Sequence, residues 1–125
     1  ADDLPYWTEV EAAGKRMPHL VVPYTLDSND MRFAAAQGFN SGTQFFDYLR
    51  DAFDTLYREG DPDGLNEPKM LSIGLHARLV GRPGRIASLE RFLDYVLEKE
   101  NVWVCRRVDI ARHWTAVHPH KAVGV

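Results

Sequence analysis

The residues best suited to chemistry lie where an apolar stretch of this sequence ends. His76 directly follows the apolar run at residues 70–75, and Arg78 lies two positions further on. A short aliphatic run of this kind is typical of a strand that is buried on both faces. Residues two apart in an extended chain point to the same side, so His76 and Arg78 are predicted to share one face. An imidazole exchanges protons near neutral pH, so His76 is either a catalytic residue or a histidine that only hydrogen-bonds a neighbouring loop.

A second polar group follows the apolar residues 20–25. The four consecutive side chains Asp27, Ser28, Asn29 and Asp30 all carry oxygen acceptors. They predict either a turn that is held by side-chain hydrogen bonds to its own backbone, or the polar wall of a site. The carboxyl ends of strands are where α/β folds bind ligands, so both interpretations stay open.

Other kinds of site have weak support in the sequence. There is no glycine-rich phosphate loop, and no Gly-x-Ser-x-Gly motif that would present a nucleophilic serine. His113, His118 and His120 form the one histidine cluster, but their spacing is poor for a metal, and residues 118–125 are expected to form a solvated tail. The single Cys105 lies in an apolar run, which indicates a buried thiol in a reducing compartment and hence a cytoplasmic protein.

Composition narrows the class of protein. The chain has 125 residues and a net charge of −3, which fits one domain or part of one, without nucleic acid as a partner. No apolar run approaches the roughly 20 residues that a membrane helix needs, so no membrane association is expected. The first residues contain no basic segment or apolar core of a signal peptide.

The predicted elements alternate along the chain. An extended piece is expected at residues 6–10, with a turn at 12–16. Uniformly apolar strands then alternate with amphipathic helices, which indicates an α/β fold with a parallel sheet. The expected strands are residues 20–25, 70–75 and 102–105, and the expected helices are 43–59 with Thr43 as N-cap, 86–98 and 108–116. Three strands leave two open edges, so we expect part of a barrel or wound sheet that associates as a homo-oligomer or with another half.

Four blocks of sequence resemble the polysaccharide-deacetylase superfamily, and more narrowly its ring-opening, allantoinase-like subgroup. The blocks occur in the family's order and span residues 2–119. They are Leu-Pro-Tyr-Trp at 4–7, Val-Pro-Tyr-Thr-Leu-Asp-Ser-Asn-Asp-Met at 22–31, Leu-His-Ala-Arg-Leu-Val-Gly-Arg-Pro-Gly-Arg at 75–85, and Val-Trp-Val-Cys-Arg-Arg-Val-Asp-Ile-Ala-Arg-His-Trp at 102–114.

The resemblance implies a fold of more than twice this length. The family forms a distorted seven-stranded (β/α) barrel, and residues 1–125 match its C-terminal half, as a partial domain that begins inside a loop of the barrel. The family's first-half motifs, an Asp at a strand end and a His-x-x-x-His segment, have no counterpart here. The chain is therefore expected to hold no cofactor itself; a divalent metal such as zinc would bind through the N-terminal half.

The resemblance also implies an activity and roles for particular residues. The intact barrel is expected to hydrolyse a C–N bond of a small cyclic amide, with allantoin opened to allantoate in purine catabolism. His76 matches the histidine of the family's last motif, which acts at the scissile bond. Trp7 matches an active-site aromatic position, and Asp27, Asn29, Asp30 and Arg78 would bind substrate. The alternatives are a metal-dependent carbohydrate or peptidoglycan deacetylase, and a non-catalytic half-barrel that pairs with a separate N-terminal half; the isolated chain is expected to be inactive.

Overall fold

The computed structural model describes residues 3–122, and it begins with a twisted β-hairpin. Strand β1 (Tyr6–Ala12) pairs antiparallel with β2 (Lys15–Val21), in a register that places Trp7 opposite Leu20. The connecting turn uses positive φ angles at Ala13 (50°) and Gly14 (73°). Positive φ at both central residues matches the twist of the flanking strands, which is why this two-residue turn closes the hairpin. The extended piece and turn expected from the sequence are confirmed.

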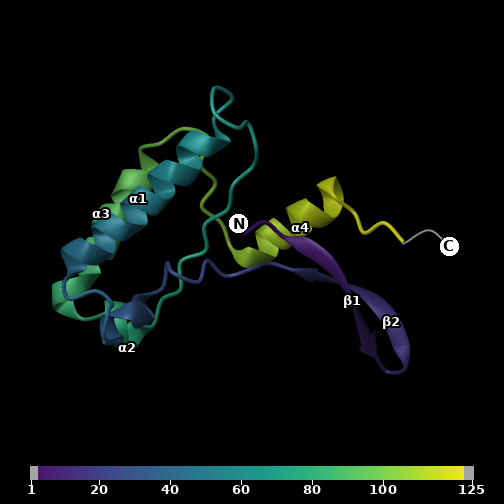
Figure 1. The fold of residues 1–125 in the computed structure, drawn as a ribbon, viewed down its shortest axis with the longest axis horizontal. Helices are drawn as coiled ribbons and strands as arrows, with labels where there is room; N and C mark the ends of the chain where they lie inside the picture. The colour runs from purple at the N-terminus through teal and green to yellow at the C-terminus, as the bar shows by residue number, and fades with distance from the viewer. Residues whose placement is uncertain (1–2, 123–125) are drawn as a thin grey trace.

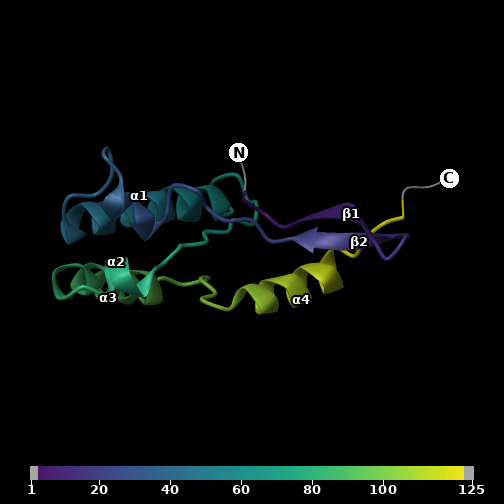
Figure 2. The ribbon, with the colours of Figure 1, turned by 90° about the horizontal axis from the view of Figure 1, so that it is seen from below.

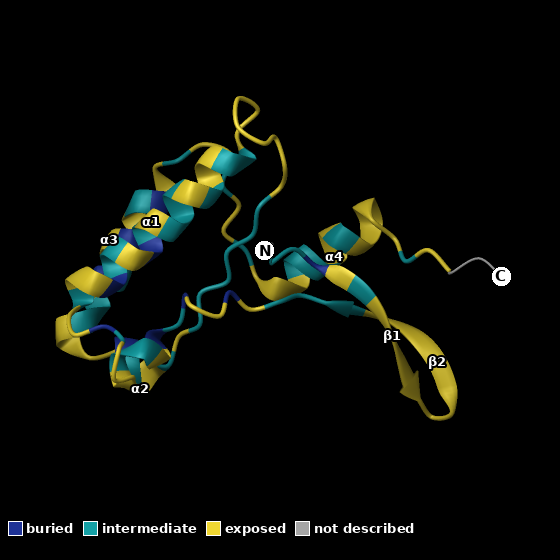
Figure 3. Ribbon diagram, in the orientation of Figure 1, coloured by how far each residue is buried: buried dark blue, intermediate teal, exposed yellow. Residues whose placement is uncertain are grey.

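Two long helices hold most of the core. Helix α1 (Gly42–Gly60) and helix α3 (Pro83–Leu97) pack side by side, as Figures 1 and 2 show. Their facing sides carry the buried residues in Figure 3. The core consists of Phe39, Phe45, Leu49, Val80, Phe92 and Val96. Apolar residues at helical spacing drive this packing, because each helix removes one apolar stripe from water.

Two short helices stand at one end of this pair. The 3-10 helix η1 (Asp30–Ala34) lies against α2 (Ala77–Val80), and α2 also contacts α3. The loop between η1 and α1 is anchored by aromatic packing, because the ring of Phe33 packs against the rings of Phe39 and Phe45, at 5.5 and 5.2 Å between centroids. The core therefore fixes the segments on which His76 and Asp30 lie.

Helix α4 (Arg107–Val117) lies apart from the other helices, beside the hairpin (Figures 1 and 2). None of its residues is fully buried. The Arg107 guanidinium reaches back to the extended segments: it donates to the carbonyl oxygens of Val22 and Pro23 and to Ser72 Oγ, and it lies 4.5 Å from the Tyr24 ring centre. Among residues 3–122, no helix has the length and apolar character needed to cross a membrane.

The predicted strands are wrong, although the helices between them are confirmed. Only the first residues of segment 20–25 lie in a strand, β2, which pairs antiparallel rather than parallel. Segment 70–75 makes one isolated parallel bridge, between Asn29 and Gly74, and segment 102–105 forms no strand. Side chains hold these segments together, as when the Ser72 N–H donates to Thr25 Oγ1 at 2.9 Å. Such bonds take the place of a continuous backbone ladder, so the three parallel strands do not form in the described residues.

The helix ends also differ slightly from the prediction. Ser41, not Thr43, is the N-cap of α1, and its hydroxyl accepts the Gln44 N–H at 3.3 Å. Helix α3 begins three residues before the expected start, at Pro83, because proline lacks the N–H that the first helical position would leave unpaired. The end of α1 at Gly60 agrees with the sequence.

Candidate active site

His76 lies at the junction between an extended segment and a helix. It is the N-cap residue of α2, with φ −126° and ψ 124°, so its backbone is still extended where the helix begins. Its side chain is 34% exposed. The ring is therefore partly covered by protein and partly open to solvent. A side chain that is held in place by neighbours and also contacts a substrate has this kind of exposure.

The Asp30 carboxylate holds the His76 ring in place. Asp30 Oδ1 lies 2.7 Å from His76 Nδ1, and the Asp30 side chain is fully buried. Asp30 Oδ2 accepts two backbone N–H groups, from His76 at 2.6 Å and from Val80 at 3.1 Å. An ionised carboxylate can only accept, so Nδ1 carries a hydrogen and the other ring nitrogen, Nε2, is left for a ligand. The sequence placed Asp30 among the substrate contacts, whereas in the structure its buried carboxylate contacts His76.

Asn29 and Ser28 place Asp30. Asn29 Oδ1 accepts the Met31 N–H at 2.8 Å and so caps η1, which begins at Asp30. The backbone on both sides of Asn29 bonds to Gly74: the Gly74 N–H donates to the Ser28 carbonyl at 2.9 Å, and the Asp30 N–H donates to the Gly74 carbonyl at 3.0 Å. Residues 28–30 are thereby fixed beside the segment that ends at His76.

Asp27 remains exposed and belongs to a neighbouring cluster. Its Oδ2 accepts the Tyr48 hydroxyl at 2.7 Å, and this hydrogen bond raises the pKa of the Tyr48 phenol above its usual value. The Arg32 guanidinium lies over the rings of Phe39 and Tyr48, 4.8 and 4.7 Å from their centres. The Tyr48 hydroxyl donates to only one oxygen of the Asp27 carboxylate, Oδ2, so this bond leaves the other oxygen, Oδ1, unused.

The other two predicted site residues are not brought to this pair by contacts in the structure. Trp7 Nε1 donates to the His118 carbonyl at 2.7 Å, and the Trp7 ring meets His120 edge-on at 5.6 Å. Figures 1 and 2 show β1, the strand to which Trp7 belongs, in the other half of the molecule from α2. Arg78 is exposed and lies in α2, so the rule for extended chains does not place it on the side of His76.

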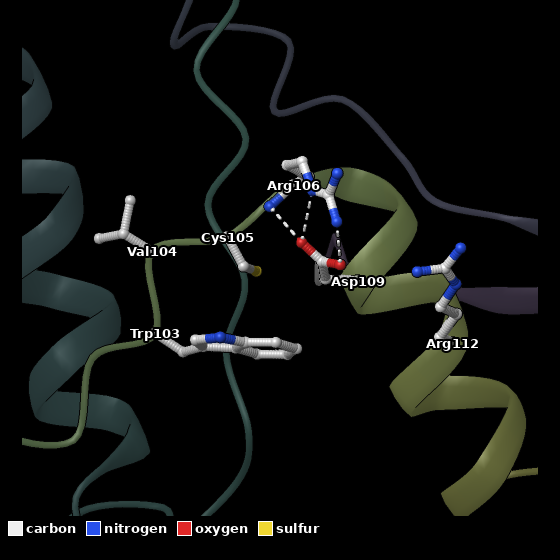
Figure 4. A pocket seen from close by; sticks show the side chains of 6 residues that line it. All are labelled: Trp103, Val104, Cys105, Arg106, Asp109 and Arg112. Atoms are coloured by element: carbon white, nitrogen blue, oxygen red, sulfur yellow. Dashed lines mark hydrogen bonds and ion pairs between the residues drawn. The ribbon is translucent and has the colours of Figure 1, made fainter.

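A surface hollow in another part of the described chain does not resemble a catalytic site. It is an open surface depression lined by Trp103, Val104, Cys105, Arg106, Asp109 and Arg112 (Figure 4). Burial, and secondarily the charge of Asp109, raise the pKa of the Cys105 thiol, which makes it a poor nucleophile. The side chain is only partly buried, however, and not fully buried as the sequence predicted. Arg106 is engaged by Asp109, with guanidinium-to-carboxylate distances of 3.0 Å.

The histidines near the C-terminus make aromatic contacts. The ring of His118 lies 4.4 Å from Trp114, and His113 lies 5.9 Å from Trp103. His118 and His120 thus contact Trp114 and Trp7, whereas residues 119, 121 and 122 are exposed as expected of a solvated tail. Residues 123–125 lie outside the described residues. No group of three or more His, Cys, Asp or Glu side chains between residues 3 and 122 is placed to hold a metal ion.

A buried carboxylate that orients a half-exposed imidazole is the arrangement of a general acid–base pair, as used by enzymes that hydrolyse amides. Sequence reasoning found both residues but missed their partnership. They are 46 positions apart, and the one available signal was that each follows an apolar run.

No protein-family model matches the sequence. The chain is 48% identical over 126 residues to a Schizosaccharomyces pombe (strain 972) protein named "Putative polysaccharide deacetylase", covering 97% of this chain and 38% of that protein. The structure of the present chain is similar to that of Puue allantoinase, with a TM-score of 0.85 and 62% identity; the match covers 96% of this chain and 38% of the allantoinase chain. A similar match is the crystal structure titled "probable Polysaccharide deacetylase from Pseudomonas aeruginosa PAO1", with a TM-score of 0.84, 61% identity and the same coverages.

These similarities confirm the resemblance to polysaccharide deacetylases and to an allantoinase. The chain spans 38% of the length of each of these proteins, so its fold corresponds to a part of theirs, as a partial domain.

Proposed function

We propose that this chain supplies the general acid of a hydrolase that cleaves an amide C–N bond. The observation that carries the proposal is the Asp30–His76 pair, with 2.7 Å between Oδ1 and Nδ1 and with Asp30 fully buried. A fixed ring can place Nε2 against a leaving nitrogen, which proton transfer requires. The likeness to proteins named as deacetylases and an allantoinase supports the same class of reaction.

The geometry accounts for the proton that the leaving nitrogen receives. Water adds to the carbonyl carbon and gives a tetrahedral oxyanion, while a base in the proposed N-terminal half takes the proton that the water loses, and the C–N bond then breaks. Protonated His76 gives its Nε2 hydrogen to the leaving nitrogen. The neutral imidazole that remains carries its hydrogen on Nδ1, which is the tautomer that Asp30 accepts. Asp30 therefore supports His76 before and after the transfer.

A cyclic amide such as allantoin is the proposed substrate in the intact barrel, with allantoate as the product. The allantoinase neighbour, at 62% identity, supports this choice. The exposed Asp27 carboxylate and the half-buried Asn29 offer hydrogen-bond acceptors to such a donor-rich molecule, although Asn29 Oδ1 already accepts the Met31 N–H. Trp7 and Arg78 are further proposed substrate contacts. They are proposed from the sequence alone, because no described interaction links them to His76.

An N-deacetylase acting on a carbohydrate or on peptidoglycan is the second candidate. The two similar proteins whose names include polysaccharide deacetylase support it. Deacetylation of this type would use a divalent metal such as zinc. The described residues do not fit one, because both oxygens of Asp30 are occupied by N–H donors and His76 Nδ1 is bonded to Asp30. The metal would need ligands from outside them, in the proposed N-terminal half of the barrel.

The third candidate is a non-catalytic half-barrel module that pairs with a separate N-terminal half or with itself. It is supported by the coverage of 38% of the similar proteins. A homo-oligomer and a cytoplasmic location remain predictions. Light scattering of this chain that shows a stable monomer near its 14.3 kDa mass would contradict the predicted association.

The function is tested with the complete encoded protein, assayed on allantoin and on an N-acetylglucosamine oligomer. We expect turnover of allantoin, and a fall in kcat of about 10²–10⁴-fold for His76→Gln, because glutamine keeps a hydrogen bond but cannot deliver a proton. His113→Gln is the matched control, since His113 lies in α4 and contacts Trp103. A near-normal kcat for His76→Gln would show that another residue is the general acid. Turnover of the oligomer alone would favour the deacetylase.

A further inference from the structure

We propose that Gly74 is a positioning residue for the Asp30–His76 pair, because only a residue without a side chain at this position leaves room for the Asn29 side chain and so lets the two segments that carry the pair meet. This inference rests on the proposed function where it concerns kcat, and on the geometry alone where it concerns the His76 ring. Gly74 lies two residues before His76, and its bridge partner Asn29 is the neighbour of Asp30.

The approach at Gly74 is unusually close. A Cβ atom placed on residue 74 would lie 2.4 Å from Asn29 Nδ2 and 2.9 Å from Asn29 Cγ. Both distances are shorter than real Cβ contacts, so the backbone or the Asn29 side chain would have to shift. Glycine inside an extended segment often marks such a close approach of another part of the chain.

Asn29 cannot move away freely. Its Oδ1 is bonded to the Met31 N–H at 2.8 Å, and its flanking backbone groups are bonded to Gly74 on both sides, at 2.9 and 3.0 Å. A side chain at residue 74 would therefore separate the two segments or break the cap of η1. Either movement displaces Asp30, the first residue of η1, from His76 Nδ1.

Asp30 can move only slightly before its hydrogen bonds are lost. Its carboxylate accepts the His76 N–H at 2.6 Å, His76 Nδ1 at 2.7 Å and the Val80 N–H at 3.1 Å, and one side chain must satisfy all three distances together. Hydrogen bonds weaken steeply as distance and angle depart from these values, so a shift of about 1 Å is enough to release the imidazole. His76 would then be free to adopt the Nε2–H tautomer that histidine prefers in water.

The test is Gly74→Ala in the complete encoded protein, with Gly84→Ala as matched control. A Cβ on Gly84, in α3, meets no heavy atom within 4 Å, so this variant changes the same residue type without the clash. Nitrogen-15 NMR of the His76 ring reports the tautomer, and steady-state kinetics report kcat and KM. We expect Gly74→Ala to convert His76 from the Nδ1–H to the Nε2–H form and to lower kcat by about 10–100-fold with little change in KM.

The double variant Asn29→Ala/Gly74→Ala identifies the cause. Without Nδ2 and Cγ, the nearest remaining Asn29 atom is Cβ at 3.5 Å, an ordinary contact. We expect the double variant to recover the Nδ1–H form and the kcat of Asn29→Ala to within about 3-fold. If Gly74→Ala does not fold, a folded double variant with the Nδ1–H form supports the inference, and a double variant that is also unfolded overturns it.

Two results distinguish failure of the inference from failure of the proposed function. A Gly74→Ala protein that keeps the Nδ1–H form, as Gly84→Ala does, refutes the role of Gly74 whatever the activity. A complete protein that turns over neither allantoin nor the oligomer refutes the proposed function. In that case the tautomer measurement by itself tests whether Gly74 positions the Asp30–His76 pair.

Discussion

Replacing Asp30 by Asn separates the charge of this carboxylate from its shape. The carboxylate accepts three N–H groups, two on Oδ2 and one on Oδ1. Asparagine has one accepting oxygen and one NH₂ group of nearly the same size. If the oxygen takes the place of Oδ2, the bonds from the His76 and Val80 backbone survive, and the NH₂ group faces His76 Nδ1. The ring nitrogen must then accept, so the hydrogen moves to Nε2 and Nδ1 cannot be protonated.

The size of the effect follows from these contacts. Hydrogen bonds to a charged group contribute about 1.5–3 kcal/mol and neutral ones about 0.5–1.5 kcal/mol, so two backbone bonds that lose charge assistance cost roughly 2–3 kcal/mol in the free energy of unfolding. The imidazolium form is lost as a proton donor, so kcat should fall by about 10²–10⁴-fold.

Urea unfolding and steady-state kinetics of the complete encoded protein measure the two effects. Asp27→Asn is the control for the unfolding free energy, because the exposed Asp27 accepts one side-chain bond, from Tyr48, and the variant should change stability by less than about 1 kcal/mol. An Asp30→Asn protein with unchanged kcat and unfolding free energy would refute the argument that a buried carboxylate orients His76.

Two further predictions concern the scaffold. Leu49→Ala should lower the unfolding free energy by about 2–5 kcal/mol, since Leu49 is fully buried between α1 and α3, whereas Leu97→Ala, at a position 68% exposed, should change it by about 0.5 kcal/mol or less in urea unfolding. The Arg106 guanidinium lowers the pKa of the Asp109 carboxyl below its usual 3.8, so the charged pair stabilises the start of α4 above that pH and this contribution is lost as pH falls through the lowered value. Thermal melts of the wild type and Asp109→Asn should therefore differ at neutral pH and converge in strong acid; an equal difference at all pH values would contradict this.

The sequence predicted those parts of the fold that depend on local pattern. Helical spacing located α1, α3 and α4, and the apolar run before His76 correctly indicated a segment that delivers this histidine. Local pattern could not predict the strands, because pairing depends on which distant segment lies alongside. Residues 70–75 are extended, but side-chain bonds hold them beside the segment that precedes η1 and beside Arg107, the first residue of α4.

The site was predicted as a set of residues but not as an arrangement. Asp27, Asn29 and Asp30 look alike in the sequence, as acceptors after one apolar run. The structure gives them three different tasks: Asp27 bonds Tyr48, Asn29 caps η1, and Asp30 is buried against His76. Burial distinguishes them, and burial is decided by the packing of η1 and α2, which no neighbouring residue in the sequence reveals.

The bond from the Val80 N–H to Asp30 has a consequence for the dynamics of the site. Helix α2 is a single turn, and a helix this short has no stability of its own in water. Its amide hydrogens at His76 and Val80 are held by a carboxylate from another segment. Opening of this turn and release of the imidazole are therefore expected to be one event, and the exchange of these two amides with deuterium should report how often the Asp30–His76 pair comes apart.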